Sequence, residues 1–236
     1  MNQTTLNLVA ITIFTLVMSS LLAPLLHLPL AVPAIAAFGI LSVATLDTLS
    51  WQGRVGALVV DGVNRFSAEH RSRIVHHEAG HFLAAYLLDI PVTGYTLSAW
   101  EAFREGLPGL GGVRFGSEEL DTAAQEGVLS SQLLDRYCTV LMAGIAAETL
   151  VYDQAEGGGD DRLKFRMLWS QLRRPEGEGE QKLQWAAFQA KNLLNAHRST
   201  YDALVTAMEQ RTPLAECYQI IEQQIQASLQ QDVVID

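Results

Sequence analysis

Cysteine and basic residues are scarce in this chain, and both shortages limit what it can do. Among its 236 residues are two cysteines, Cys138 and Cys217, whose separation argues against a disulfide framework or a cysteine-rich metal site. We expect two buried free thiols. The formal net charge is -10 at pH 7, so no basic stripe can neutralise phosphates, and nucleic acid is not expected as a partner. The length allows one compact domain plus an accessory segment.

Charged residues are also absent from two long stretches near the N-terminus, residues 6–26 and 28–46. Each stretch is about as long as a helix that spans a bilayer. We therefore predict a transmembrane helical hairpin over residues 1–50, with the lipid bilayer as a partner and Asp47 ending the second span. A cleaved signal peptide over roughly residues 1–23, or a single span, is an alternative, although no Lys or Arg precedes the apolar stretch. A hairpin buried in a soluble core is a further alternative.

The arginine positions predict which side of the membrane the rest of the chain occupies. Arginines follow the second apolar stretch, whereas the turn between the two stretches has no basic residue. These arginines are Arg54, Arg65, Arg71 and Arg73. Basic residues are retained on the cytoplasmic side, so we expect the rest of the chain in the cytoplasm or an equivalent space such as a stroma. Residues 51–66 are expected to form a linker or interfacial segment, because their apolar run is too short to cross.

One short motif carries most of the chemical information: His77-Glu78-Ala79-Gly80-His81. Two histidines four residues apart lie on one face of a helix, so both imidazoles can reach one metal ion. Glu78 can then take a proton from a water molecule at that metal, which is typical of a zinc peptidase. Leaving these polar groups buried without a metal or partners would cost on the order of several kcal/mol, which argues against an ordinary core helix.

The helix that carries this motif is expected to begin after Ser67, a suitable N-cap, with Glu69 in its first turn. Two further histidines, His70 and His76, belong to the same segment. We interpret both as surface residues or as neighbours of the ligands rather than as ligands.

A small β-hairpin is predicted after the motif. Residues 91–98 alternate and contain β-branched and aromatic side chains, which is typical of a strand, and residues 113–115 can return as its partner. In zinc peptidases a strand beside the metal commonly holds an extended substrate at the sheet edge. An ordinary hairpin that closes the core is the alternative.

A catalytic zinc normally has three protein ligands, so a third residue must join the two histidines. A helix is predicted from Ser130 to about Tyr152, and its small residues 143–147 would let the helix of the motif approach closely. Near this segment the sequence has three candidate ligands. They are Glu148, at the end of the small-residue run, and Asp160 and Asp161, which follow a glycine turn. Asp160 also suits the N-cap of the next helix, which would leave Asp161 free to face the metal.

The order of these motifs resembles the peptidase domain of FtsH-family membrane zinc proteases, over roughly residues 66–225. The resemblance rests on the HEAGH motif, the strand that follows it, residues 142–148 and the aspartate turn, with a weaker match in the helical tail. It implies that His77, His81 and Asp161 bind Zn²⁺ and that Glu78 is the general base. It also implies a mainly α fold, in which a helical zinc-metallopeptidase domain over residues 67–236, with a small β-hairpin, follows the transmembrane hairpin.

The chain departs from this family because it contains no Gly-x-x-x-x-Gly-Lys-Ser/Thr loop, the signature of an ATPase module. We therefore expect an ATP-independent metalloprotease that hydrolyses flexible or unfolded segments of protein and peptide substrates. Two alternatives are a membrane-anchored assembly or scaffold protein that keeps its zinc site, and a subunit that works with a separate ATPase chain. Association with itself or with other membrane proteins is compatible with each of these.

The C-terminal part is expected to be mainly helical between Trp185 and Val233. Before it, residues 174–180 combine charged residues with proline and glycine, and we predict a surface linker there. A lid over the active site is the alternative for this segment.

Overall fold

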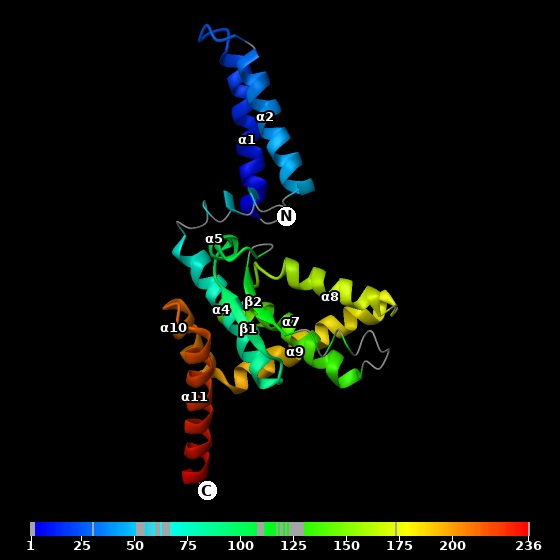
Figure 1. Ribbon diagram of the computed structural model, residues 1–236, viewed down its shortest axis with the longest axis vertical. Helices are drawn as coiled ribbons and strands as arrows, with labels where there is room; N and C mark the ends of the chain where they lie inside the picture. Colours follow the sequence, from blue (N-terminus) through cyan, green and yellow to red (C-terminus); the bar gives the residue numbers. More distant parts are fainter. Residues whose placement is uncertain are drawn as a thin grey trace. The chain divides into compact units, whose positions relative to one another are not determined.

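The protein is mainly helical, with one small antiparallel sheet, as the sequence predicts (Figure 1). The computed structural model describes residues 3–29, 31–50, 55–56, 58–59, 62, 67–107, 111–116, 118, 120, 122, 130–172 and 174–235. The chain divides into two compact units. The first comprises Met1–Ala68 and Ser98–Gly111, and the second comprises Glu69–Leu97 and Gly112–Asp236.

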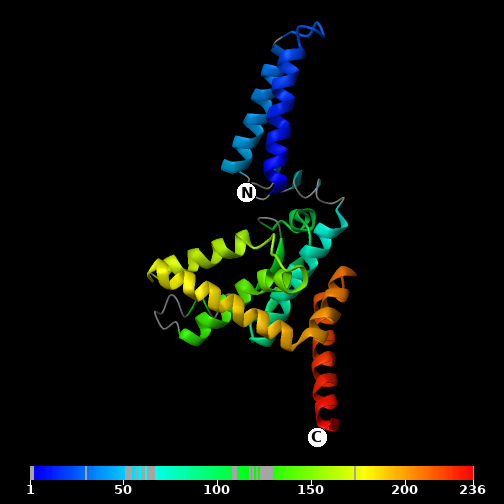
Figure 2. The same ribbon diagram turned by 180° about the vertical axis from the view of Figure 1, so that it is seen from behind.

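The first unit contains the two apolar helices α1 (Gln3–Leu22) and α2 (Ala31–Ser50), which run side by side (Figures 1 and 2). By length and composition α2 is able to cross a membrane, whereas the apolar part of α1, Leu6–Leu22, is shorter. Asp47, the predicted end of the second span, lies inside α2, which continues to Ser50. Its carboxylate instead accepts the backbone N–H groups of Val55 and Gly56, at 2.9 and 2.7 Å.

The same unit contains the short helix α5 (Ala99–Arg104), which is capped by the Ser98 hydroxyl. Most of the predicted linker 51–66 and the centre of the turn that precedes residue 112 lie outside the described residues.

In the second unit, helix α4 (Ala68–Leu87) begins directly after Ser67 and leads into the sheet. Strands β1 (Val92–Thr96) and β2 (Gly112–Phe115) pair antiparallel, with a register shift between Val92 and Gly94. Both strands lie where the alternation of the sequence predicts them.

The remaining helices build the body of the second unit. They are α7 (Ser131–Tyr152), α8 (Gly159–Gln171), α9 (Glu176–Ala196), α10 (Arg198–Glu209) and α11 (Leu214–Ile235). The Ser130 hydroxyl caps α7 by accepting the N–H of Leu133. Helix α7 packs against α8 and α9, and α10 packs against α11. The helical interpretation of the C-terminal part is therefore confirmed.

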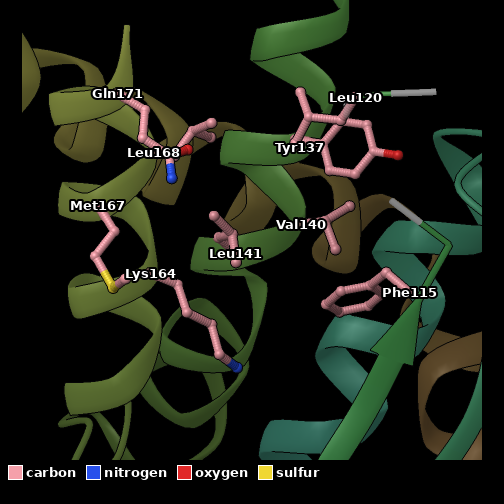
Figure 3. A pocket seen from close by; sticks show the side chains of 9 residues that line it. All are labelled: Phe115, Leu120, Tyr137, Val140, Leu141, Lys164, Met167, Leu168 and Gln171. Carbon is pink, nitrogen blue, oxygen red and sulfur yellow. The ribbon is translucent and has the colours of Figure 1, made fainter. Parts of the chain in front are cut away.

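One core cluster lies between α4, the sheet, α7 and α9–α11, and a second lies between α7, α8 and α9. Between α7, α8 and β2, apolar side chains line a pocket of about 330 Å³ (Figure 3).

The predicted linker at residues 174–180 is wrong, because α9 already begins at Glu176. The Trp169 indole N–H donates to the carbonyl of Pro175 at 2.9 Å, which holds the start of the helix against α8. Gly179 is buried there, and a Cβ at this position would lie 2.9 Å from the Trp169 ring. This glycine therefore permits close packing inside a helix rather than a turn.

Candidate metal centre

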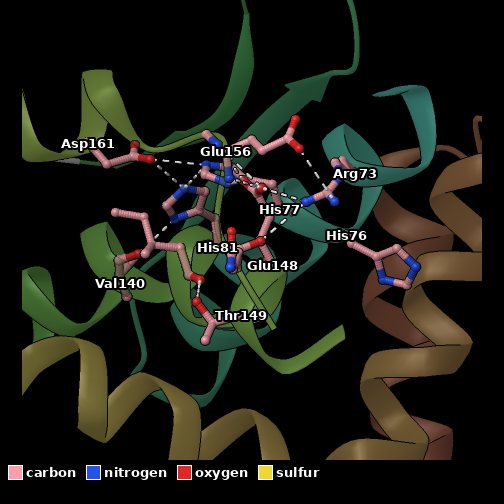
Figure 4. Close-up of polar contacts among 12 residues, drawn as sticks. Arg73, His76, His77, His81, Val140, Glu148, Thr149, Glu156 and Asp161 are labelled. Carbon is pink, nitrogen blue, oxygen red and sulfur yellow. Dashed lines mark hydrogen bonds and ion pairs between the residues drawn. The ribbon is translucent and has the colours of Figure 1, made fainter. Parts of the chain in front are cut away.

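Two histidines and one aspartate from different helices meet at a single point in the second unit (Figure 4). Helix α4 presents His77 and His81 one turn apart, and the first turn of α8 presents Asp161. Nε2 of His77 lies 3.0 Å from Oδ2 of Asp161 and 3.1 Å from Nε2 of His81. Nε2 of His81 lies 3.4 Å from the same Asp161 oxygen.

These distances suit a tetrahedral metal ion. Ligand atoms around a zinc with bonds of about 2.0–2.1 Å are separated by about 3.3–3.4 Å. The three atoms of the candidate site form a triangle of nearly this size, so one ion can contact all of them. A donor set of two imidazole nitrogens and one carboxylate oxygen is common in catalytic zinc sites. The group of His77, His81 and Asp161 can therefore hold a metal ion.

Space for such an ion is left by a glycine of α7. A Cβ added at Gly144 would overlap Nε2 of His77 and lie 2.5 Å from Nε2 of His81, so a larger residue here would crowd both ligand nitrogens. A second glycine, Gly80 of α4, has Ala147 Cβ and the Ala143 carbonyl at 2.5 and 2.7 Å from an added Cβ. The small-residue run of α7 thus receives the helix of the motif, as the sequence predicts.

The orientation of both imidazoles is set by acceptors on their other nitrogen. Nδ1 of His77 donates to Oε1 of Glu148 at 2.7 Å, and Nδ1 of His81 donates to the carbonyl of Val140 at 2.7 Å. With Nδ1 engaged in this way, Nε2 of each ring faces the common point. Carboxylate and carbonyl partners of this kind accompany most metal-binding histidines, fixing the tautomer and raising the basicity of the ligand.

Glu148 is itself held in place by several donors (Figure 4). Its carboxylate accepts the backbone N–H groups of Glu156 and Gly157, at 2.9 and 3.2 Å, and pairs with Arg73 at 3.9 Å. The Arg73 guanidinium also lies over the ring of Tyr152, 4.3 Å from its centroid. Glu148 therefore acts as a buried partner of His77, on the side of the ring away from the common point.

The charges of the site favour a cation. Burial alone would lower the pKa of His77, but hydrogen bonds to Asp161 and Glu148 and the nearby charge of Glu78 raise it to about 10. Burial alone would raise the pKa of Asp161, but His81 and His77 hold it well below its usual range. The pKa of Glu148 is lowered too, because hydrogen bonds from His77 and the backbone outweigh its burial. A metal ion that binds here must displace the extra proton of His77.

Glu78 has a partner that the sequence did not reveal. Its Oε2 accepts the backbone N–H of Val113 in β2 at 2.7 Å. A Cβ at Gly112, where φ is +119°, would lie 3.0 Å from the same oxygen. The conformation of β2 at Gly112 therefore brings its backbone onto the carboxylate of the motif. Such a long-range backbone contact has no signal in the spacing of residues.

Of the three candidates for the third ligand, the structure places one, Asp161, against both histidines. Asp161 is buried and lies against both histidines, whereas Asp160 is exposed. Asp160 is not the N-cap either, since α8 begins at Gly159 and Gly158 precedes it with φ +82°. Glu148 contacts Nδ1 of His77, so it binds the nitrogen of that ring that does not face His81 and Asp161.

His76 turns away from the candidate site (Figure 4), and its Nδ1 lies 2.9 Å from the hydroxyl of Tyr201. His70 is half-buried in the first part of α4. Both cysteines are free and buried, and burial raises the pKa of Cys138 to about 12. The interpretation of Cys138 and Cys217 as buried free thiols is confirmed.

No protein-family model matches this chain, and no curated protein matches it. The geometry of the candidate metal centre is therefore the main indication of what the protein does.

Proposed function

We propose that this chain is a membrane-anchored, ATP-independent zinc metalloprotease that resembles the peptidase domain of the FtsH family. The observation that carries the proposal is the convergence of Nε2 of His77, Nε2 of His81 and Oδ2 of Asp161 within 3.0–3.4 Å of one another. Three ligands leave a fourth tetrahedral position for water, which distinguishes catalytic zinc sites from structural ones.

In this proposal His77, His81 and Asp161 hold Zn²⁺, which, when bound, polarises a carbonyl and lowers the pKa of a water molecule. Glu78 takes up the proton of the attacking water and later returns it to the leaving amine. Glu148 and the carbonyl of Val140 keep the two imidazoles in the tautomer that turns Nε2 to the metal. The hydrogen bond from Val113 holds the Glu78 carboxylate beside β2.

The contact between Val113 and Glu78 also indicates where a substrate would lie. The N–H of Val113 is directed to Glu78 rather than to β1, so this edge of β2 faces the motif. An extended peptide that pairs with such an edge would pass close to Glu78. Because the sequence has no ATP-binding loop, we propose flexible or already unfolded segments as substrates. An anchor in helix α2 would restrict the enzyme to substrates near a membrane.

The first test compares Glu78→Gln with the wild-type chain in lipid nanodiscs, using a fluorogenic unfolded protein such as labelled casein. Glutamine keeps an oxygen that can accept the N–H of Val113 but is no base, so we expect zinc to remain bound and cleavage to fall by about 10²- to 10⁴-fold. Glu180→Gln, at an exposed position of α9, is the control and should cleave at the wild-type rate.

His77→Ala tests the metal separately. This variant should lose zinc, as measured by mass spectrometry of the metal in the purified protein. Equal cleavage by wild type and Glu78→Gln would contradict the proposed base. A zinc-loaded wild-type chain that cleaves no unfolded protein would contradict the protease and favour the scaffold alternative.

A further inference from the structure

Helix α5 exposes its large side chains and buries its small ones. Trp100 and Phe103 are 53 % and 50 % exposed, whereas Ala99 and Ala102 are buried. A helix on the surface of a water-soluble domain normally does the opposite, because it turns its large apolar residues to the core. The aromatic face of α5 therefore contributes nothing to the core and needs another explanation.

The two aromatic side chains form one surface. Trp100 and Phe103 are three residues apart, so they lie on the same face of the helix. Their rings stack, with centroids 5.8 Å apart and an angle of 21° between the ring planes. Single exposed apolar residues are common on proteins, whereas adjoining ones mark a surface that another molecule covers.

Hydrogen bonds fix this short helix at its C-terminal end as well as at its capped start. The N–H of Gly106, where φ is +70°, donates to the carbonyl of Phe103 at 3.0 Å. The N–H of Leu107 donates to the carbonyl of Ala102 at 2.9 Å. This pair of bonds is a Schellman motif, which requires a positive φ that glycine adopts at little cost. The aromatic surface thus belongs to a well-defined helix rather than to an irregular loop.

The position of α5 in the molecule indicates what covers its aromatic face. Helix α5 belongs to the same compact unit as α1 and α2, although α4 and β1 come between them in the sequence. By length and composition α2 is able to cross a bilayer. Tryptophan is enriched where a membrane meets water, since its indole is largely apolar yet has an N–H to donate. A stacked aromatic pair in the unit that carries α2 therefore fits the lipid–water interface.

The charges of α5 indicate which lipids such a contact requires. Glu101 and Glu105 are acidic, and Arg104 is the basic residue beside them. Anionic headgroups attract clusters of lysine and arginine, and this segment has no such cluster. A contact of α5 with a membrane would therefore depend on its aromatic rings and would form on zwitterionic lipid.

We propose that Trp100 and Phe103 insert into the interfacial layer of the bilayer and give the chain a second membrane contact besides its apolar helices. This inference rests on the membrane anchor of the proposed function and adds to it a partner for α5, the lipid surface itself. Because α5 connects β1 with β2 (Figure 1), the contact would hold that connection at the membrane.

Tryptophan fluorescence of the full chain in phosphatidylcholine vesicles tests the contact. Bromine atoms on the acyl chains, placed near the headgroup or near the chain end, quench a tryptophan that reaches them, whereas iodide quenches from the water. The difference between wild type and Trp100→Phe isolates the emission of Trp100. Trp185→Phe is the matched control, because Trp185 is 39 % exposed but belongs to α9 in the second unit.

The emission of Trp100 should lose most of its intensity with bromine near the headgroup and less with bromine near the chain end. It should also be shielded from iodide. The emission of Trp185 should show the reverse, with quenching by iodide and none by brominated lipid. Equal iodide quenching of both tryptophans, without quenching by bromine, would overturn the contact. Shielding of Trp100 from iodide without quenching by bromine would show that protein covers α5, and would overturn the lipid contact too.

Extraction with alkaline carbonate separates this inference from the anchor. Wild type and the double variant Trp100→Ser/Phe103→Ser should both stay with the vesicles, since the apolar helices are unchanged. A retained wild-type chain whose Trp100 is not quenched by bromine would overturn the contact and leave the anchor standing. If carbonate removes the wild-type chain, the anchor is contradicted. Quenching of Trp100 by bromine before extraction would then still support the contact of α5, and its absence would overturn it.

Discussion

At the scale of single residues, the two nitrogens of His77 have different partners, and this makes metal binding depend on a residue that is not a ligand. Oε1 of Glu148 lies 2.7 Å from Nδ1 and holds the ring so that Nε2 faces Asp161 and His81. Glu148 is 2 % exposed, so its hydrogen bond to His77 is shielded from solvent. A negative charge at this point also makes the imidazole a better donor to a metal.

Glu148→Gln should therefore bind zinc about 10- to 100-fold more weakly than wild type, although no ligand is changed. Competition with a chromophoric chelator measures this affinity. Glu156→Gln is the matched control, because Glu156 contacts Glu148 through its backbone N–H and its own side chain is 69 % exposed. If both variants bound zinc as tightly as wild type, the orienting role of Glu148 would be refuted.

Protonation of His77 gives a second prediction at this scale. With no metal bound, its pKa is raised to about 10, so the ring carries an extra proton at neutral pH and must lose one when a metal binds. Metal and proton compete for Nε2. The apparent affinity for zinc should rise about tenfold for each pH unit between roughly pH 7 and 9, and level off as the pH passes the pKa of His77.

The stability of the metal-free protein should change with pH in the opposite direction. A raised pKa in the folded state stabilises the fold below the unfolded value of 6.5, and this contribution is lost as the pH rises towards 10. Raising the pH should therefore weaken the metal-free fold at this site while it strengthens zinc binding. Calorimetric titrations of zinc in buffers of different ionisation enthalpy count the released protons. Zinc binding at neutral pH without proton release would show that His77 carries no extra proton in the metal-free protein.

At the scale of elements, the close approach of α4 and α7 decides whether the ligands can meet. Small residues at 143–147 predict that approach, and the structure confirms it through Gly80 and Gly144. The helix of the motif, both strands and α7 were also predictable, because each has a clear period and a suitable cap or turn. These features are local, so they can be recognised without knowing which elements pack together.

Gly144→Ala is the sharpest test of this packing. The added Cβ would overlap Nε2 of His77 and come within 2.5 Å of Nε2 of His81, so the variant should lose most of its zinc. Alanine is the better helix former by about 1 kcal/mol, so circular dichroism should show an undiminished helix content. Gly177→Ala, in α9 with no atom within 4 Å of the added Cβ, should keep its zinc. A Gly144→Ala protein with full zinc content would place the ion elsewhere.

Contacts between distant elements were not predictable from local signals. Glu148 was one of three candidates for the third ligand, and its true contact, Nδ1 of His77, depends on how α7 and α4 pack. The N–H of Val113 reaches Glu78 only because β2 folds back against α4. At residues 176–180 the glycines and charges suggested a linker, yet packing of Gly179 against Trp169 favours a helix.

At the scale of the whole molecule, the apolar N-terminal helices and the metal centre make different demands on the sequence. The first requires only sufficient length and a low content of charged residues, and α2 meets this criterion. The candidate metal centre requires Asp161 to meet His77 and His81, which lie eighty-four and eighty positions earlier, at 3.0 and 3.4 Å. Composition therefore predicts a membrane anchor, whereas the meeting of ligands depends on the complete fold of the second unit.

The arginines predict the side of a membrane on which the second unit would lie, and this prediction can be tested on the intact chain. Arg54, Arg65, Arg71 and Arg73 follow α2, and the turn between α1 and α2 has no basic residue, so the second unit is expected on the cytoplasmic side. In right-side-out vesicles, a C-terminal tag should resist added protease until detergent opens the membrane. Placing arginine at Leu25 and Leu26, which are 76 % and 61 % exposed in the turn, should make part of the population insert the other way. Full digestion of the wild-type tag in sealed vesicles would put the metal centre on the outer side, where cytoplasmic segments of membrane proteins could not be its substrates.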